Sequence, residues 1–363
     1  MKYYIIAGEA SGDLHGSNLM KGLRAKDPDA VIRFWGGDMM QAADPGAQMV
    51  RHYREGAVMG LTEVIAKART LLGNVDFCKK DILAWRPDVV ILIDYPGFNF
   101  KIAKFAHESG IKVFYYIAPK TWASREKRNA SLKAWVDRLF IIFPFEKEYF
   151  GSRGIPYSYK GNPLIDAVDD HEFSPPVEGS YIALLAGSRK GEISRMMPVC
   201  MEIADLLGRN VVIAGAPART KEDYEKYIGT RKNVKLIFGR TYDILKYADA
   251  AIINSGTASL EAALVGTPQV VCYGFNYITY LIARLTVRIR HISLPNIILG
   301  REAVLELIQG KCTPEAILTE LDLLLLDYSR LARLAADYAE LRARMEKPGA
   351  ASRLASGMIS MLK

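Results

Sequence analysis

The sequence has few cysteines and histidines, and neither kind is clustered. Its four cysteines stand singly with no Cys-x-x-Cys pair, and its five histidines are equally scattered. Zinc sites and disulfide scaffolds need such residues at close, regular spacing. The sequence therefore predicts neither a zinc framework nor a disulfide framework, and it favours a reducing compartment.

Long apolar runs are also absent. The longest, such as Val89–Ile93, have the length of a strand, whereas a helix needs roughly 20 apolar residues to span a bilayer. The apolar stretch within Met1–Glu9 is too short for a signal peptide, and a polar loop follows it directly. We therefore expect a soluble protein of the cytoplasm.

Acidic residues are outnumbered by basic ones. The chain has 48 Lys and Arg against 40 Asp and Glu, a formal charge of +8, and residues 262–301 contain no acid at all. Such a balance predicts an anionic partner: nucleic acid, an acidic membrane surface or a phosphorylated substrate. Nucleic acid is disfavoured, because no aromatic residues are interleaved with the basic runs as a stacking platform requires and no recognition-helix motif occurs.

The pattern of apolar residues predicts an α/β fold. Short β-branched and aromatic runs alternate with helix-length amphipathic segments, which is typical of parallel strands buried on both faces. Two sets of five such strands exceed one compact sheet, so we expect two facing Rossmann-like, doubly wound domains and a helical C-terminal segment. The expected strands are 2–7, 31–36, 89–94, 112–117 and 139–143, then 181–186, 210–215, 234–237, 250–254 and 269–273.

A polar stretch stiffened by two prolines, residues 166–179, marks the expected domain boundary. The sequence predicts a first domain over 1–168 and a second over 169–348. Beyond Pro314 the pattern is helical throughout, and two roles are open for this part of the chain: it supports a dimer, or its last helix, at about 349–363, returns to the first domain.

Polar residues follow the first expected strand, where ligands bind in open parallel sheets. Residues 8–13, Gly-Glu-Ala-Ser-Gly-Asp, fit neither a dinucleotide loop nor a phosphate-binding P-loop in their spacing. Ser11 and Gly12 permit close backbone approach to a ligand, and Glu9 is a carboxylate that a helix cap does not require. The alternative is that Ser11 or Asp13 merely caps the helix.

Asp94 ends the most hydrophobic strand and precedes Tyr-Pro-Gly. A carboxylate at the end of a buried strand is well placed as a general base, because burial and neighbouring charges tune its pKa. The alternative is that Asp94 caps the next helix.

Two loops of the second half, taken together, predict a site for a nucleotide diphosphate, whereas either loop alone fits the capped start of a helix. After its first strand, Ser188 and Arg189 combine a small-residue turn with a guanidinium that grips phosphate. A second loop opens a helix whose N-terminal N–H groups suit a diphosphate, and Glu261 within that helix is placed to accept hydrogen bonds from a ribose. The residues of this second loop are Ser255, Gly256 and Thr257.

These loops, in this order, resemble those of the lipid-A-disaccharide synthase family, bacterial glycosyltransferases of outer-membrane lipid A assembly. The resemblance implies a GT-B fold and the inverting transfer of 2,3-diacylglucosamine from UDP to 2,3-diacylglucosamine 1-phosphate, which forms a β-1,6 disaccharide and needs no cofactor. It covers residues 5 to about 302. The matching stretches are 7–13, 57–60 with Glu63-Val64, 94–99, 120–128, 143–147, 187–189, 255–261 and 293–296.

The resemblance also implies roles for individual residues. Asp94 becomes the base that acts on the acceptor 6-hydroxyl, and Glu9 the second catalytic candidate. The first domain binds the acceptor, the second binds the UDP-sugar, and the family suggests a homodimer. The acceptor side would further include Ser11 and Gly12, and the UDP side Ser188, Arg189, Ser255, Gly256, Thr257, Glu261 and Asn296.

The residues support this chemistry without a metal. An inverting sugar transfer needs a base and stabilisation of the departing UDP, and a guanidinium with a helix N-terminus supplies the latter. No Asp-x-Asp pair is placed as a metal-dependent transferase would use it. The sequence therefore predicts full activity in EDTA.

Both implied substrates carry acyl chains, so we expect contact with the anionic surface of the inner membrane from the cytoplasmic side. Two amphipathic stretches with basic residues are candidates, 59–72 and 277–292. A core-facing helix is the other explanation of the first. The candidate contact residues are Leu61, Val64, Ile65, Leu281, Arg284 and Arg288.

Other functions fit part of the pattern. A UDP-N-acetylglucosamine 2-epimerase, or another UDP-sugar enzyme of the GT-B class, has a similar nucleotide site, but an epimerase needs no lipid-facing surface. A two-domain sugar-binding protein would normally carry an export signal. The basic apolar stretches favour the transferase.

Overall fold

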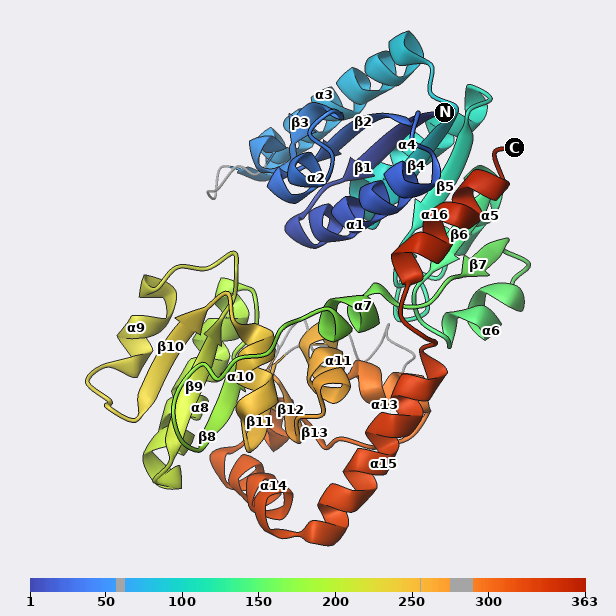
Figure 1. Cartoon of the computed structure of the whole chain (residues 1–363). Coiled ribbons are helices and arrows are strands. Elements are labelled where there is room, and N and C mark those ends of the chain that lie inside the picture. The colour runs from blue at the N-terminus through green and yellow to red at the C-terminus, as the bar shows by residue number, and fades with distance from the viewer. Residues whose placement is uncertain (57–62, 255, 275–289) are drawn as a thin grey trace. The chain divides into compact units, whose positions relative to one another are not determined.

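The computed structural model describes residues 1–56, 63–254, 256–274 and 290–363, and the backbone alone for residues 63–71. The chain divides into two compact units (Figure 1). The first comprises Met1–Pro163 with Lys347–Lys363, and the second comprises Leu164–Glu346. The expected boundary at residue 168 lies just beyond this division, inside helix α7 (Pro163–Asp169).

The first unit is built on a parallel sheet of seven strands in the order β3-β2-β1-β4-β5-β6-β7. Its strands are β1 (Lys2–Ala7), β2 (Val31–Gly36), β3 (Gln48–His52), β4 (Val89–Ile93), β5 (Lys112–Tyr116), β6 (Arg138–Ile141) and β7 (Tyr157–Tyr159). Its helices are α1 (Ala10–Lys26), α2 (Asp38–Ala43), α3 (Glu63–Trp85), α4 (Pro96–Glu108), α5 (Arg128–Trp135), α6 (Glu146–Gly151) and α16 (Ala350–Ser360), with a 3-10 turn at Tyr53–Gly56.

Both faces of this sheet are buried, which explains the continuous apolar strands. All five side chains of β4 are buried, as are those of β1 after Lys2. Alternate side chains such as Tyr4 and Ile6 pack with residues of α3, α4 and α5 in one apolar cluster. A parallel strand with helices on either side gains from apolar residues at every position.

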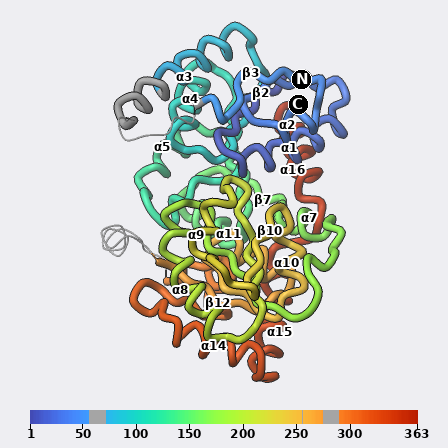
Figure 2. Tube along the Cα trace, turned by 90° about the vertical axis from the view of Figure 1, so that its left-hand side faces the viewer, coloured from blue at the N-terminus to red at the C-terminus, as the bar shows by residue number. Residues whose placement is uncertain are grey.

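Helix α16 returns from the end of the chain to pack against α1 (Figures 1 and 2). The two helices approach closely at Gly22, where a Cβ atom would lie 2.9 Å from the carbonyl oxygen of Ala351. The Arg353 Nε donates to the carbonyl of Lys160 at 3.2 Å, which ties the helix to the segment after β7. The first unit is therefore completed by residues that follow the whole of the second unit in sequence.

The second unit repeats this topology with a parallel sheet in the order β10-β9-β8-β11-β12-β13. Its strands are β8 (Tyr181–Leu185), β9 (Asn210–Gly215), β10 (Val234–Phe238), β11 (Ala250–Ile253), β12 (Gln269–Tyr273) and β13 (Glu306–Ile308). Its helices are α7, α8 (Lys190–Leu207), α9 (Glu222–Ile228), α10 (Thr241–Tyr247), α11 (Gly256–Val265), α13 (Leu294–Leu299), α14 (Pro314–Leu326) and α15 (Tyr328–Arg344), with a 3-10 turn at Gln309–Lys311.

The predicted α/β class, with two Rossmann-like units and a helical C-terminal segment, is confirmed, and all ten expected strands are present with ends that differ by at most a few residues. Three strands were not predicted: β3, β7 and β13. Each lies at an edge of its sheet and is largely half-buried, so none has the apolar run by which strands are recognised. No helix within the described part of the chain is both long enough and apolar enough to cross a membrane.

Candidate active site

The first candidate site lies where the strand order of the first sheet reverses. Strands β1 and β4 are parallel neighbours, with Ala7 opposite Ile93, so the loops that follow them emerge side by side at one edge. Any Cβ atom at position 8 would run into the ring of Tyr95. Gly8 is therefore required for the two loops to touch, and open α/β sheets bind their ligands at such a crossover.

Asp94 occupies an unusual backbone conformation at this edge. Its φ angle is 44° and that of Tyr95 is 46°, both in the left-handed region, which costs of order 1–3 kcal/mol per non-glycine residue. The carbonyl oxygen of Asp94 accepts hydrogen bonds from the Tyr115 hydroxyl at 2.6 Å and the Asn99 Nδ2 at 2.7 Å. Asn99 is fully buried, so the turn is held from the interior of the unit.

The carboxyl group of Asp94 is half-buried, and its environment disfavours ionisation. Burial is the main cause that raises its pKa, and the nearby Glu9 carboxylate raises it further, while the Lys120 ammonium opposes both. A carboxylate with a raised pKa is a stronger proton acceptor. The arrangement can therefore take a proton from an alcohol bound at this edge.

The other residues of the first loop divide into exposed and structural ones. Glu9 is the N-cap residue of α1, but its side chain makes no capping bond, and both Glu9 and Ser11 are exposed. Gly12 permits α1 to lie close to β1, because a Cβ there would be 3.2 Å from the Cβ of Ala7. The helix therefore leaves Glu9 and Ser11 open to a ligand.

Asp13 does not cap its own helix, and this alternative expectation is wrong. Its buried carboxylate accepts hydrogen bonds from the backbone N–H groups of Gly37 at 2.7 Å, Met39 at 3.1 Å and Met40 at 3.1 Å. Asp13 thus caps α2 from a distance. A side chain can serve as an N-cap for another helix because only the acceptor position matters.

A hollow of about 310 Å³ opens beside Asp94 within the first unit. It is bounded by the loop between β5 and α5, which sequence reasoning did not assign to the site. Three of its lining residues are cationic. The lining residues are Asp94, Pro96, Pro119, Lys120, Thr121, Ser124, Arg125 and Arg128.

The second candidate site lies at the matching crossover of the second sheet. Strands β8 and β11 are parallel neighbours, and the buried Asn254 at the end of β11 donates from Nδ2 to the carbonyl of Ala186 at 3.2 Å. The turn at Gly187, with φ of 107°, therefore adjoins the start of α11. Asn254 lies two residues before Gly256, the first residue of α11, and Ser255 between them lies outside the described residues.

Glu192 occupies the amides that the Arg189 loop would offer to an anion. Its Oε2 accepts the backbone N–H groups of Ser188 at 2.9 Å and Arg189 at 3.1 Å. Its Oε1 accepts from the Arg189 guanidinium at 2.8 Å. The Arg189 side chain is 82% exposed. A bound diphosphate would have to replace this internal carboxylate.

Glu261 lies within α11 and accepts a 3.0 Å hydrogen bond from the Tyr242 hydroxyl. Burial raises the pKa of Glu261 to about 7. Thr257 is exposed at the start of the same helix. The carboxyl group can therefore change its hydrogen-bonding character near neutral pH.

Asn296 has a different role from the one expected. It is 0% exposed, and its Nδ2 donates to the Val304 carbonyl and to Glu306 Oε1, both at 2.9 Å. Its Oδ1 accepts the N–H groups of Ala303 at 2.8 Å and Val304 at 3.0 Å. With every polar atom engaged and no surface, Asn296 organises the turn before β13 and has no group left for a ligand.

The side chains of the expected membrane-contact residues lie outside the described part of the structure. Leu61 falls in the gap at residues 57–62, and of Val64 and Ile65 only the backbone, in α3, is described. The other three, Leu281, Arg284 and Arg288, fall in the gap at residues 275–289.

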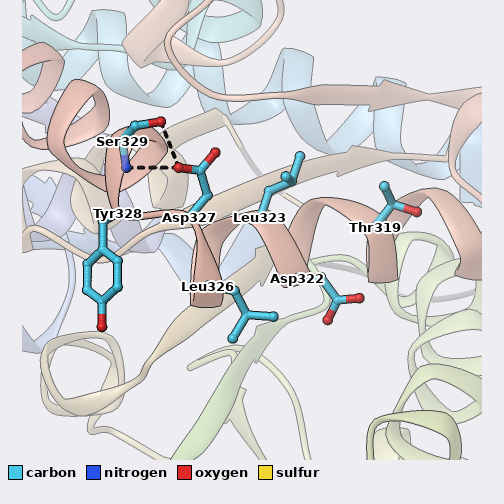
Figure 3. A pocket seen from close by; sticks show the side chains of 7 residues that line it. All are labelled: Thr319, Asp322, Leu323, Leu326, Asp327, Tyr328 and Ser329. Carbon is cyan, nitrogen blue, oxygen red and sulfur yellow. Dashed lines mark hydrogen bonds between the residues drawn. The ribbon is translucent and has the colours of Figure 1, made fainter.

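A larger hollow, of about 700 Å³, lies where α14 meets α15 (Figure 3). Its most prominent polar group, Asp327, accepts hydrogen bonds from the Ser329 amide at 2.8 Å and the Ser329 hydroxyl at 2.7 Å. These bonds lower the pKa of Asp327 and cap α15. The hollow is otherwise lined by Thr319, Asp322, Leu323, Leu326 and Tyr328. Figure 3 shows the carboxylate of Asp322 pointing away from that of Asp327.

Some known proteins are similar to this chain in sequence, and others are similar in fold at low sequence identity. The sequence profile of a family described as lipid-A-disaccharide synthetase matches residues 3–357. The lipid-A-disaccharide synthase of Syntrophus aciditrophicus is 38% identical over 99% of this chain and 97% of its own length.

Two solved structures share the fold at low identity. A putative UDP-N-acetylglucosamine 2-epimerase from Listeria monocytogenes has a TM-score of 0.70 at 15% identity, over 100% of this chain and 96% of that one. A calicheamicin glycosyltransferase has a TM-score of 0.64 at 15% identity, over 99% and 98%. At 15% identity, the likeness of this chain to either structure concerns the fold alone.

Proposed function

The chain belongs to the lipid-A-disaccharide synthetase family, and we propose that it moves a 2,3-diacylglucosamine unit from UDP to 2,3-diacylglucosamine 1-phosphate. It is a glycosyltransferase of lipid A biosynthesis with the GT-B class of fold. The observation that carries the proposed chemistry is Asp94, a half-buried carboxylate with a raised pKa at the crossover of the first sheet.

In this mechanism Asp94 is the general base. Its carboxylate takes the proton of the acceptor 6-hydroxyl as that oxygen attacks C1 of the donor sugar. The bond between C1 and the β-phosphate oxygen breaks on the opposite side, which inverts the configuration at C1 and releases UDP. Glu9 supports this role because its negative charge raises the pKa of Asp94, and Ser11 and Gly12 border the same edge.

We propose that the second unit holds UDP. Arg189 would pair with the diphosphate after it leaves Glu192, and the amides at Ser188, Gly256 and Thr257 would bind phosphate oxygens, as helix N-termini do. Glu261 would accept from the ribose hydroxyls. Ser255 belongs to the same proposed loop, and Asn296 acts as a positioning residue. The guanidinium and helix ends would stabilise the charge of departing UDP.

Release of UDP with and without the acylated sugar phosphate tests the function. We expect release by the wild-type protein only when donor and acceptor are both present. Asp94→Asn should lose release while binding UDP with unchanged affinity. UDP release from the donor alone at the full rate would contradict the proposal.

The epimerase alternative is tested with UDP-N-acetylglucosamine alone, since an epimerase needs no acceptor. We expect no exchange of the sugar configuration. Appearance of UDP-N-acetylmannosamine would favour the epimerase.

We further propose that the chain works at the anionic cytoplasmic surface of the inner membrane, because both proposed substrates are acylated. The basic apolar stretches 59–72 and 277–292 are the proposed contacts. A homodimer remains a prediction from the family, for which sedimentation is the direct measurement.

A further inference from the structure

The loop from Lys120 to Arg128 places three cations around the hollow beside Asp94. Within the described part of the chain, no carboxylate forms an ion pair with Lys120, Arg125 or Arg128, although most other arginines there are paired. Within the loop itself, Glu126 forms its ion pair with Arg153, at 2.7 Å. With Asp94 as the one carboxylate in its lining against three cations, the hollow carries an excess of positive charge.

Two of these cations repel each other. Burial lowers the pKa of Arg128, and the Arg125 guanidinium lowers it further. Arg128 lies over the ring of Phe100 at 5.5 Å, while Arg125 adopts a φ of 59° in the left-handed region. Like charges held together at a strained position are costly without a counter-ion, and such costs concentrate at binding sites.

A buried hydroxyl beside these cations also lacks a partner. Thr121 is 3% exposed, and its Oγ1 makes no hydrogen bond within the described residues. A buried polar group without a partner costs of order 1–3 kcal/mol. Thr121 is among the residues that line the hollow.

The loop is held in place by a hydrogen bond to the buried Glu146, so the hollow exists without a ligand. The buried Glu146 accepts from the Trp122 Nε1 at 3.1 Å and from the backbone N–H groups of Ile142 at 3.2 Å and Phe143 at 3.0 Å. A pre-arranged set of cations and a hydroxyl binds an anion without first having to order the loop.

We propose that this hollow is a phosphate monoester site, in which Arg125 and Arg128 grip the phosphate, Lys120 adds charge and the Thr121 hydroxyl donates a hydrogen bond. Three cationic side chains suit a phosphate monoester, which carries nearly two negative charges at neutral pH. Resting on the proposed function, the phosphate is that of the acceptor sugar. Its capture beside Asp94 would fix the acceptor hydroxyl within reach of the base, which is catalysis by positioning.

Charge-removing substitutions test the site by kinetics. Arg125→Gln and Arg128→Gln should each raise the KM for the phosphorylated acceptor by roughly ten- to a hundredfold, with little change in the KM for the UDP-sugar. The acceptor without its phosphate should be used equally poorly by all proteins. Lys127→Gln is the matched control, because Lys127 is exposed in the same loop but does not line the hollow. Arg128→Lys should restore part of the loss.

Direct binding separates this proposal from the proposed function. We would follow the ³¹P line width of glucosamine 1-phosphate with the full chain in saturating UDP, so that the second unit is occupied. Broadening by wild type and Lys127→Gln, but not by Arg125→Gln or Arg128→Gln, supports the site even if no transfer occurs. Equal broadening by all four proteins, or an unchanged preference for the phosphorylated acceptor, overturns it.

A lipid headgroup is the other source of a phosphate monoester. Flotation with phosphatidylcholine vesicles containing phosphatidic acid distinguishes it. If Arg125→Gln and Arg128→Gln weaken flotation but leave glucosamine 1-phosphate binding intact, the hollow binds the headgroup of a membrane lipid and our assignment is wrong. Unchanged flotation together with lost sugar phosphate binding supports the acceptor.

Discussion

The hydroxyl of Tyr115 donates a 2.6 Å hydrogen bond to the backbone carbonyl oxygen of Asp94. The proposed base is thus held by a fully buried residue on the neighbouring strand. Because Asp94 has a φ of 44°, this bond stabilises a backbone conformation that the residue would otherwise leave. The position of the carboxylate therefore depends on a side chain that lies beneath the site.

Tyr115→Phe should lower kcat by about tenfold and leave UDP affinity unchanged, since it removes a positioning bond and no substrate contact. The free energy of unfolding should fall by about 1 kcal/mol. Tyr4→Phe is the control. Tyr4 lies on the same sheet, and its hydroxyl donates a 2.7 Å hydrogen bond to the Asp81 carboxylate. It should lose comparable stability but keep kcat, and an equal loss of kcat in both variants would show that Tyr115 acts only through stability.

Asp94→Asn should reduce kcat by about 10²–10⁴-fold and yet stabilise the protein. Burial raises the pKa of Asp94 in the folded state, so above its ordinary pKa the folded state carries a penalty for ionisation that the unfolded chain does not. Asparagine removes this penalty. The thermal midpoint of the variant should exceed that of wild type at pH 8, with the gap closing toward pH 4. A lower midpoint at pH 8 would count against the assigned environment.

Glu192→Ala should bind UDP roughly three- to tenfold more tightly, because the carboxylate that occupies the Ser188 and Arg189 amides is gone. The same change removes a helix cap and should cost about 1 kcal/mol of stability. Glu202→Ala is the control on the exposed face of α8 and should change neither quantity. Calorimetric titration with UDP measures the effect, and weaker binding by Glu192→Ala would mean that Glu192 helps to form the site.

UDP affinity should fall as the pH drops through about 7, where Glu261 takes up a proton. The protonated carboxyl accepts fewer hydrogen bonds from ribose hydroxyls, which should weaken binding by up to about tenfold. The terminal phosphate of UDP itself titrates near pH 6, so the comparison is with Glu261→Gln, which lacks the carboxyl proton. Parallel pH profiles for both proteins would exclude Glu261 from the ribose contact.

Vesicles containing anionic lipid should bind the protein reversibly at low salt and release it at high salt. Arg284→Gln and Arg288→Gln should each weaken this binding roughly fivefold. Lys235→Gln, at an exposed position on β10, removes the same charge elsewhere and should have little effect. Equal losses in all three variants would point to net charge alone and not to the proposed stretch.

The central strands were predictable because burial on both faces leaves a clear mark in the sequence. Every side chain of β4 and β8 is buried, so each reads as an unbroken apolar run. The edge strand β7, Tyr-Ser-Tyr, is half-buried at all three positions and resembles a polar turn. Such strands are specified by a neighbour already in place, which no local pattern records.

The candidate site follows from sequence where polar residues come soon after a central strand. Asp94 directly follows β4, and Arg189 lies in the loop after β8. The sheet topology places both loops at the crossovers, and the functional roles of the two residues stay predictions. The Lys120–Arg128 loop was harder, because its cations look like ordinary surface charge until their lack of acidic partners is seen. Its signals in the sequence were the match of residues 120–128 to the family and the excess of basic residues between 99 and 145.

Because α16 packs on α1, the first unit is synthesised first but cannot complete its fold until the last residues of the chain have been made. The first unit leaves the ribosome before the second, yet the α1 face around Gly22 stays uncovered until α16 has emerged. During that interval the nascent chain exposes apolar surface for the time needed to make the entire second unit. Completion of the proposed acceptor-binding unit is thereby coupled to the translation of the nucleotide-binding one.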